Sequence, residues 1–321
     1  MSVLHRLASL RLAPDGEPRP DAPFGQGPLA ARVLRGTIVG ASAVAGRLPV
    51  STVHPLTGVG ATLEWAARPG KRRQLAANLC HTLGLPPDHP DVKALVRREM
   101  RNEARRSADF LWALANPHEL LATTEIHGRE HLDDALARGH GVLLVSTHVG
   151  GWEVATALPE AIVPVPTTAI VTDDWLAWAV EGLRIRAGLG IMYDSEPVSK
   201  AARLLRAGEA ILVLADYAKD WMRTYPVRLL DGVVELPAGM VVLARLCGTP
   251  LIPFSVLPVA PRRWRVEIEA PLDPPARDGG TEAEKEVLQT LADRWTATLR
   301  THAEHWAAVY PMTWHQELQT Q

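Results

Sequence analysis

His148 and Glu153 lie five residues apart and have the residue types that general-base chemistry needs. A histidine side chain ordinarily titrates near neutral pH, so it can take a proton from an attacking hydroxyl. A nearby carboxylate can fix the tautomer of the imidazole and stabilise the imidazolium that forms. The pattern therefore predicts that His148 acts as a base and that Glu153 is its partner. The backbone N–H groups of Gly150 and Gly151 between them are expected to stabilise a developing oxyanion.

The residues around this pair predict a strand, a tight turn and a short helix. The apolar, partly β-branched run 141–145 is typical of a short buried strand, and it brings His148 to the carboxyl end. Two glycines then turn the chain, and Trp152 begins a helix that Pro159 stops. The spacing of His148 and Glu153 can arise by chance in a chain with 12 histidines. The competing interpretation is a histidine whose hydrogen bonds are satisfied within a loop and that has no catalytic role. The strand context favours function, because ligands and catalytic groups gather at strand ends in α/β folds.

The segment 124–153 resembles the bacterial lipid A biosynthesis acyltransferase family, which includes the phosphatidylinositol-mannoside acyltransferases. A Gly-x-Glu-x-Leu element begins at Gly128, and a His-x-Gly-Asn-Trp-acid pattern begins at His148. Gly151 stands where the family usually has Asn, and 230–232 reads Leu-Asp-Gly where it has Phe-Phe-Gly. Weaker matches follow in order between residues 70 and 314: Asn78-Leu79, Arg184–Ile191, Leu204–Asp216, Glu235–Ala244, Thr249–Phe254 and Ala303–Trp314.

The resemblance implies an enzyme that moves a fatty acyl group from acyl-CoA or acyl-carrier protein to a hydroxyl of a glycolipid or phospholipid-type acceptor. The acceptor hydroxyl itself attacks, so no acyl-enzyme, metal or further cofactor is expected. Arg184 or Arg186 is expected to bind a phosphate or help at the oxyanion, with a structural salt bridge as the alternative. Asp216, at a predicted strand end, is expected to orient a basic partner or the acceptor. The implied partners are the thioester donor, the lipid acceptor and the membrane surface.

Other function classes are weaker. A soluble acyltransferase that acylates a small amine or alcohol is the first alternative. The His-x-x-Glu-His arrangement of His127 and His131 matches some zinc peptidases, although Gly128 interrupts it. A non-catalytic membrane-binding protein would leave the His148 pattern without a purpose. A serine hydrolase is disfavoured because no Gly-x-Ser-x-Gly elbow exists.

Composition fits a globular, cytoplasm-facing protein of 321 residues. The apolar fraction of 47% and charged fraction of 22% are ordinary, and a net charge of −2 gives no argument for nucleic acid. Cys80 and Cys247 lie far apart, which indicates free thiols in a reducing compartment. The 10 tryptophans suit a water–lipid boundary. We expect the cytoplasmic face of the cell membrane, peripherally or weakly anchored, with the cytoplasm as the alternative.

Three regions are expected along the chain: a flexible leader at 1–28, a helical subdomain at 29–120, and an α/β core at 121–315 with a mixed central sheet flanked by helices. Expected strands are 142–147, 165–171, 189–193, 210–215, 250–257 and 264–269. Expected helices are 62–68, 71–83, 91–116, 152–157, 175–185, 197–206, 238–247 and 282–305, with a Pro/Gly break in 50–70.

Two segments of the helical subdomain leave alternatives open. The apolar stretch 36–46 is shorter than the about 20 residues that span a bilayer. It belongs either to a buried or surface helix, or to an interfacial helix lying on a membrane. The helix 91–116 carries a basic face that is either solvated, with Glu99 and Glu103 as partners, or a contact for anionic lipid headgroups. That face comprises Arg97, Arg98, Arg101, Arg105 and Arg106.

Overall fold

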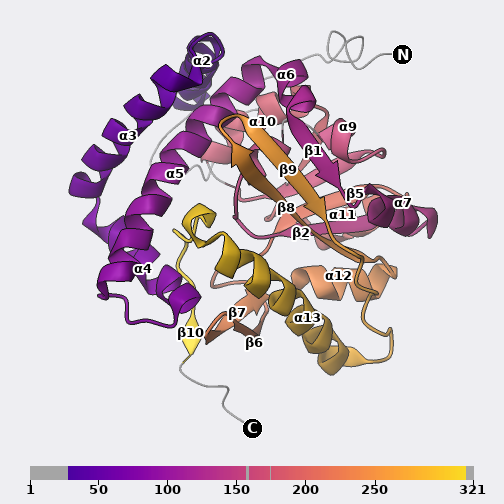
Figure 1. Ribbon diagram of the computed structural model, residues 1–321. Coiled ribbons are helices and arrows are strands. Elements are labelled where there is room, and N and C mark those ends of the chain that lie inside the picture. Colours follow the sequence, from indigo (N-terminus) through magenta and orange to yellow (C-terminus); the bar gives the residue numbers. More distant parts are fainter. Residues whose placement is uncertain (1–27, 157–158, 174, 316–321) are drawn as a thin grey trace.

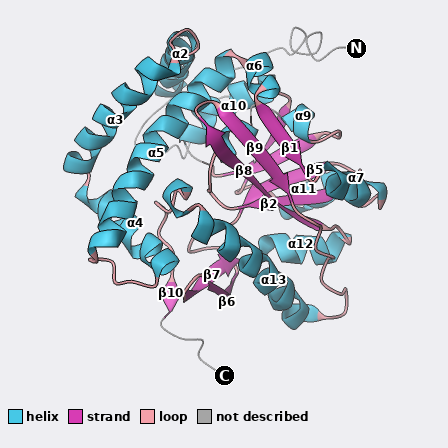
Figure 2. Cartoon of the chain, viewed as in Figure 1, coloured by secondary structure: helices cyan, strands magenta, loops and turns pink. Residues whose placement is uncertain are grey.

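The computed structural model describes residues 28–156, 159–173 and 175–315 (Figure 1). The leader predicted at 1–28 lies outside the described residues, apart from Pro28, which begins the first helix. The described chain is a mixed α/β structure with helices at its N-terminal side, as predicted (Figure 2). The division into a helical subdomain and a core stays a prediction.

The N-terminal layer consists of the helices α2 Pro28–Ala45, α3 Val50–Ala67, α4 Pro69–Leu83, α5 Pro90–Ala115 and α6 Pro117–Ala122. Proline opens α4, α5 and α6, where its missing N–H costs no helical hydrogen bond. None of the described helices combines the length and apolar character that crossing a bilayer requires.

Two expectations about these helices need correction. The break expected in 50–70 is absent within α3, which runs continuously through Pro55. Packing of α3 along α5, with Val53 and Ala61 buried, compensates for the hydrogen bond that the proline removes. The N-cap of α5 is His89, whose ring accepts a hydrogen bond from the backbone N–H of Asp91 at 3.2 Å. Asp91 therefore lies inside the first turn instead of capping it.

The central sheet has the strand order β1-β9-β8-β2-β5-β3-β4 in the described chain. Its strands are β1 Thr124–His127, β2 Val142–Ser146, β3 Thr167–Val171, β4 Leu189–Tyr193, β5 Ala210–Leu214, β8 Leu251–Ala260 and β9 Arg263–Ile268. Strand β2 is parallel to both β5 and β8, whereas β9 is antiparallel to β8. All six predicted strands lie in this sheet, and β1 is an addition.

Strand β2 is buried on both faces, which explains its continuous apolar sequence. Leu143 and Val145 join the core formed with α4, α5, α11 Val198–Arg206, α12 Gly239–Cys247 and α13 Gly280–Thr301. Val142 and Leu144 face a second core with α7 Arg129–Ala137 and α8 Trp152–Ala155. The other core helices are α9 Pro159–Ile162 and α10 Trp175–Arg186.

A smaller antiparallel sheet was missed from sequence. Its central strand β7 Gly232–Pro237 pairs with β6 Thr224–Leu229 on one side and with β10 Trp314–His315 on the other, and α13 packs against β6 (Figure 1). The helix expected at 282–305 ends earlier, because His302 leaves helical geometry with φ −122° and ψ 34°. A short 3-10 turn at Ala303–His305 follows and contacts α5.

Candidate active site

The register of β2 and β5 brings His148 and Asp216 together. The two parallel strands pair Ser146 with Leu214, so the residues two positions beyond each strand end lie opposite one another. The Nδ1 atom of His148 lies 2.6 Å from Oδ1 of Asp216. The backbone N–H of His148 donates to Oδ2 of the same carboxylate at 3.0 Å. Both residues are buried, His148 at 6% and Asp216 at 3% exposure.

A tryptophan completes the environment of this carboxylate. The Nε1–H group of Trp306 donates to Oδ2 of Asp216 at 2.8 Å. Burial alone would raise the pKa of Asp216, but the proximity of His148 and these donors outweigh it and lower the pKa. Asp216 is therefore an ionised acceptor, which places the proton of a neutral His148 on Nδ1. The other ring nitrogen, Nε2, keeps a lone pair that can accept a proton.

Glu153 does not occupy the orienting position that the spacing suggested, because Asp216 holds Nδ1 of His148. Glu153 lies in the first turn of α8 and influences His148 by charge. The pKa of the Glu153 carboxyl is raised, because the effect of burial outweighs the positive charges of Arg106 and Arg184, which act to lower it. The motif thus supplies a second carboxyl group within electrostatic range of His148, and the charges of one arginine from α5 and one from α10 act on it.

The expected oxyanion donors are already engaged. The N–H of Gly150 donates to the carbonyl of His305 at 2.9 Å, and that of Gly151 donates to the carbonyl of Val256 at 2.6 Å. These contacts fix the turn and remove both amides as donors to a substrate. Gly150 has φ +67°, and a Cβ there would lie 2.0 Å from the Val256 carbonyl oxygen. The turn requires glycine at this position.

The two candidate arginines lie in the last turn of α10. The charge of Arg184 acts on the Glu153 carboxyl, so the two side chains lie within electrostatic range of each other. Arg186 is the final residue of the helix, and the structure does not describe its side chain. The structure thus brings His148 and Asp216 into direct contact, and the charge of His148 also acts on Glu153, as that of Arg184 does.

Three aromatic rings lie around the imidazole: Trp152 belongs to the motif that begins at His148, whereas Tyr217 and Tyr310 were not predicted as site residues. The ring centroid of Tyr310 lies 4.8 Å from that of His148, Trp152 lies at 5.0 Å and Tyr217 at 5.7 Å. Tyr217 and Tyr310 stack on each other at 4.0 Å. Tyr217 directly follows Asp216, so its place could have been inferred from the strand end. Tyr310 and Trp306 lie far along the chain, and no local signal places them here.

The C-terminal segment forms one wall of the site. The N–H of Ala307 donates to the carbonyl of His148 at 2.9 Å. Together with the hydrogen bond from Gly150 to the carbonyl of His305, it pairs this segment with the turn after β2. Asn78 of α4 anchors the same segment, since its side-chain amide donates to the carbonyls of Ala308 and Tyr310 at 2.7 and 2.8 Å. The helical layer therefore holds the segment that carries Trp306.

The possible zinc motif is dispersed. His127 ends β1 with an exposed side chain, and His131 lies in α7. Across the described ranges, no cluster of three or more His, Cys, Asp or Glu residues is placed to hold a metal ion. The structure lends no support to zinc chemistry at this motif.

Comparisons with known proteins identify a matching family and two similar proteins. A family model described as bacterial lipid A biosynthesis acyltransferase matches residues 33–312. A phosphatidylinositol mannoside acyltransferase of Mycobacterium tuberculosis (strain ATCC 25618 / H37Rv) is 26% identical over 260 residues, covering 76% of this chain and 78% of that protein. A protein of the same name from Mycolicibacterium smegmatis (strain ATCC 700084 / mc(2)155) is 26% identical over 278 residues, covering 82% of this chain and 86% of that protein.

Proposed function

The chain belongs to the bacterial lipid A biosynthesis acyltransferase family, and from that premise we propose that it transfers a fatty acyl group from a thioester donor to a hydroxyl of a glycolipid, with His148 as the general base. The donor is acyl-CoA or acyl-carrier protein. The acceptor class is a mannosylated phosphoinositide, in line with the names of the two mycobacterial relatives. The observation that carries the proposal is the buried His148–Asp216 pair at the ends of two adjacent parallel strands.

Proton transfer follows from the hydrogen bonds of that pair. Nε2 of His148 takes the proton as the acceptor oxygen attacks the thioester carbonyl carbon. The imidazolium that forms is stabilised by Asp216, which accepts its Nδ1–H. Collapse of the tetrahedral intermediate breaks the C–S bond, and the imidazolium returns its proton to the departing thiolate. The products are the acyl ester and the free thiol, and no acyl-enzyme is formed.

Glu153 assists this step by charge. Its carboxylate lies near enough to His148 for their charges to interact, so an ionised Glu153 favours the imidazolium. Arg106 and Arg184 oppose the effect of burial and favour the ionised form of Glu153. We assign Arg184 this supporting role in place of direct phosphate binding.

A membrane surface is the proposed location of the acceptor. The helices α2 and α3 expose several large apolar side chains: Val33, Val39, Val44, Leu56, Val59 and Leu63. Of these, Leu56, Val59 and Leu63 on α3 are each at least 60% exposed. Apolar side chains gathered on adjoining helices favour contact with lipid over contact with water alone. This face supports peripheral binding to the cytoplasmic side of the membrane.

The test is turnover with identification of the product. Purified protein is given palmitoyl-CoA or palmitoyl-acyl-carrier protein, each with a mannosylated phosphatidylinositol fraction, with plain phosphatidylinositol, or with small alcohols and amines. Mass spectrometry follows the acylated product. The proposal expects ester formation with the glycolipid fraction. Product formed only from a small amine or alcohol would replace the lipid acceptor with a soluble one.

A further inference from the structure

A segment near the C-terminal end carries two aromatic side chains to the catalytic pair. We refer to residues 304–310 as the strap. The Nε1–H group of Trp306 donates to Oδ2 of Asp216 at 2.8 Å. The ring centroid of Tyr310 lies 4.8 Å from that of His148. The position of the strap therefore decides where a hydrogen-bond donor meets the carboxylate that orients the base.

The strap is not held by strand pairing. It consists of the end of a 3-10 turn, one isolated bridge between Trp306 and Val149, and loop. Trp306, Ala307 and Ala308 are buried. Buried carbonyls outside a strand need hydrogen-bond donors from other parts of the protein.

Helix α4 supplies two such donors. Gln74 and Asn78 lie four residues apart, so they share one face of the helix. The side-chain amide of Asn78 donates to the carbonyls of Ala308 and Tyr310 at 2.7 and 2.8 Å. The amide of Gln74 donates to the carbonyl of Tyr310 at 3.3 Å. Asn78 is fully buried, so water cannot take over its hydrogen bonds.

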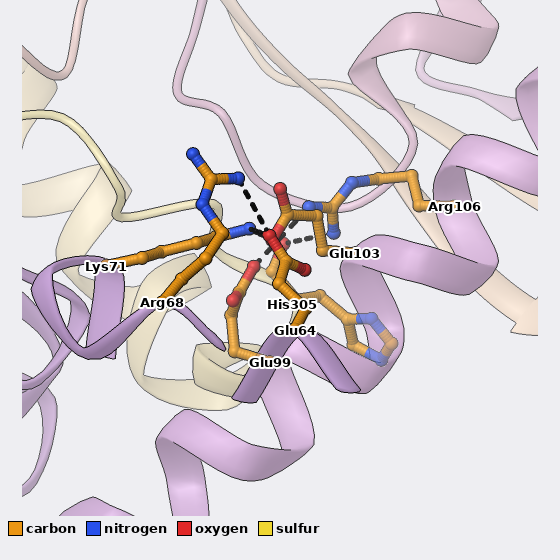
Figure 3. Close-up of polar contacts among 7 residues, drawn as sticks. All are labelled: Glu64, Arg68, Lys71, Glu99, Glu103, Arg106 and His305. Carbon is orange, nitrogen blue, oxygen red and sulfur yellow. Dashed lines mark hydrogen bonds and ion pairs between the residues drawn. The ribbon is translucent and has the colours of Figure 1, made fainter. Parts of the chain in front are cut away.

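Helix α5 repeats this arrangement. Asn102 and Arg106 are also four residues apart. The side-chain amide of Asn102 donates to the carbonyl of Glu304 at 2.8 Å. The guanidinium of Arg106 donates to the carbonyl of His305 at 3.4 Å (Figure 3). Side chains of two helices thus hold carbonyls on both sides of Trp306.

Three hydrogen bonds fix the amide of Asn78. Its nitrogen faces two carbonyls, while its Oδ1 accepts from Nε1–H of Trp314 at 2.9 Å. Acceptors on one side and a donor on the other allow only one orientation of the amide. Asn78 is therefore a rigid connection between α4 and the backbone of the strap.

We propose that Asn78, assisted by Asn102, is a positioning residue: it holds the strap so that Trp306 donates to Asp216. Without the Asn78 amide, two buried carbonyls lose their donor and the strap shifts. Trp306 then no longer meets Asp216, which accepts more strongly from His148. A role in acyl transfer rests on the proposed function, whereas the hydrogen bond itself can be measured without substrate.

Proton NMR of the ligand-free protein tests the proposal. The Nδ1–H between His148 and Asp216, whose heavy atoms lie 2.6 Å apart, is expected to give a strongly deshielded signal that disappears in His148→Gln. The signal is compared in wild type, Asn78→Ala, Trp306→Phe, their double variant, Asn102→Ala and Thr249→Val. Thr249 is the control, because it is also fully buried and donates to the carbonyl of His140 at 2.7 Å, before the start of β2. Thermal unfolding checks each fold.

Trp306→Phe is expected to move the signal downfield, because Asp216 then has one donor fewer. Asn78→Ala is expected to move it similarly, and the double variant no further. Asn102→Ala is expected to give a smaller displacement, and it replaces Asn78→Ala in the test if that variant does not fold. Thr249→Val is expected to keep the wild-type signal. A wild-type signal in the folded asparagine variant would overturn the positioning role, and so would additive displacements in the double variant.

Turnover is the second readout. Asn78→Ala is expected to lower kcat by roughly tenfold to a hundredfold with little change in KM, because a small misplacement at the reacting atoms is enough for such a loss. Thr249→Val is expected to keep the wild-type kcat. A raised KM at unchanged kcat would overturn the role of Asn78 in the reaction. If the wild type transfers no acyl group, the proposed function fails, and the NMR comparison still decides the role of Asn78.

Discussion

Asp216 accepts three hydrogen bonds, from the ring and backbone of His148 and from Trp306. Such a carboxylate both orients the base and stays ionised as the base gains its proton. The negative charge of the Asp216 side chain is therefore more important for this role than the volume of the side chain. Glu153, in contrast, acts on His148 through its charge.

We predict that Asp216→Asn lowers kcat by roughly 10³-fold, because the imidazole loses both its tautomer preference and the charge that stabilises it. Near-ultraviolet circular dichroism checks that the variant is folded. Glu153→Gln, the paired variant of the second carboxylate, is expected to have a smaller effect on kcat. The assignment of Asp216 as the orienting group fails if the two effects are reversed.

Gly151 stands against a tryptophan ring. A Cβ at this position would lie 2.4 Å from Cζ3 of Trp264. We predict that Gly151→Ala destabilises the protein by about 1–3 kcal/mol, the usual cost of overpacking. The cost is expected to shrink in a Trp264→Phe background, where the ring is smaller. Urea unfolding of the wild type, the two single variants and the double variant measures the coupling between the two positions. If Gly151→Ala lowers the unfolding free energy equally in both backgrounds, the Trp264 ring is not the obstacle. Trp264 thus explains why an asparagine would not fit where this chain has glycine.

The residue patterns paired His148 with Glu153, whereas in the structure Nδ1 of His148 lies 2.6 Å from Oδ1 of Asp216. Spacing along one strand and turn identified His148, because the signal was local. Asp216 was placed at a strand end, yet its pairing with His148 depends on which strands are neighbours, and β5 follows β2 only after two intervening strands. The hydrogen bonds that the amides of Gly150 and Gly151 donate likewise depend on distant acceptors, in the C-terminal segment and in β8. Contacts between distant segments cannot be read from spacing.

At the scale of elements, α5 connects the helical layer to the active site. It carries Glu99 and Arg106, both buried, and Arg106 reaches the carbonyl that accepts the N–H of Gly150. Burial first, and then the charge of Glu103, raise the pKa of Glu99 to about 8, although Arg106 and Lys71 oppose this. Figure 3 shows these side chains side by side. Glu99 is therefore largely protonated in the folded protein at neutral pH.

This raised pKa predicts that stability falls as pH rises. Between the ordinary value of 4.5 and about 8, the folded protein holds a proton on Glu99 that the unfolded chain releases. The free energy of unfolding then decreases with pH, by at most about 1.4 kcal/mol per unit from this group. Glu99→Gln cannot titrate, so its unfolding free energy is expected to depend less on pH. Thermal unfolding at pH 6 and pH 8 compares the wild type with Glu99→Gln. If the unfolding free energy changes equally between the two pH values in both proteins, the effect of Glu99 is refuted.

Strand prediction succeeded where burial left a clear signal and failed elsewhere. Strands β2, β4 and β5 are short apolar runs, which identify buried parallel strands. Strands β6 and β7 contain Pro226 and Pro237, and β6 alternates buried and exposed residues. The prolines argue against strands and concealed this alternation, which is otherwise typical of a half-buried strand. The residue pattern also underestimated α3, because packing on α5 outweighed a proline and two glycines.

At the scale of the whole molecule, α2 and α3, the helices that carry the exposed apolar side chains, lie away from α12 and α13 (Figure 1). We predict that Leu56→Ser with Leu63→Ser lowers binding to phosphatidylcholine vesicles containing phosphatidylinositol by more than tenfold. Full burial of one such side chain contributes about 1.5–3 kcal/mol. Sedimentation with vesicles measures the bound fraction.

Leu246→Ser on α12 is the control, since Leu246 is also exposed but lies outside this face. Its vesicle binding is expected to match that of the wild type. Sedimentation of the double variant at the wild-type level would remove the apolar face as the membrane contact and favour a soluble acceptor.

The central claim is that His148 is the base in direct transfer from a thioester to a lipid hydroxyl. The most direct measurement is the rate of thiol release from palmitoyl-CoA or palmitoyl-acyl-carrier protein in the presence of the acceptor lipid, for wild type and His148→Ala. The account predicts acceptor-dependent release in the wild type and a loss of roughly 10³-fold or more in a folded variant. A folded His148→Ala protein that keeps most of the acceptor-dependent rate would contradict it.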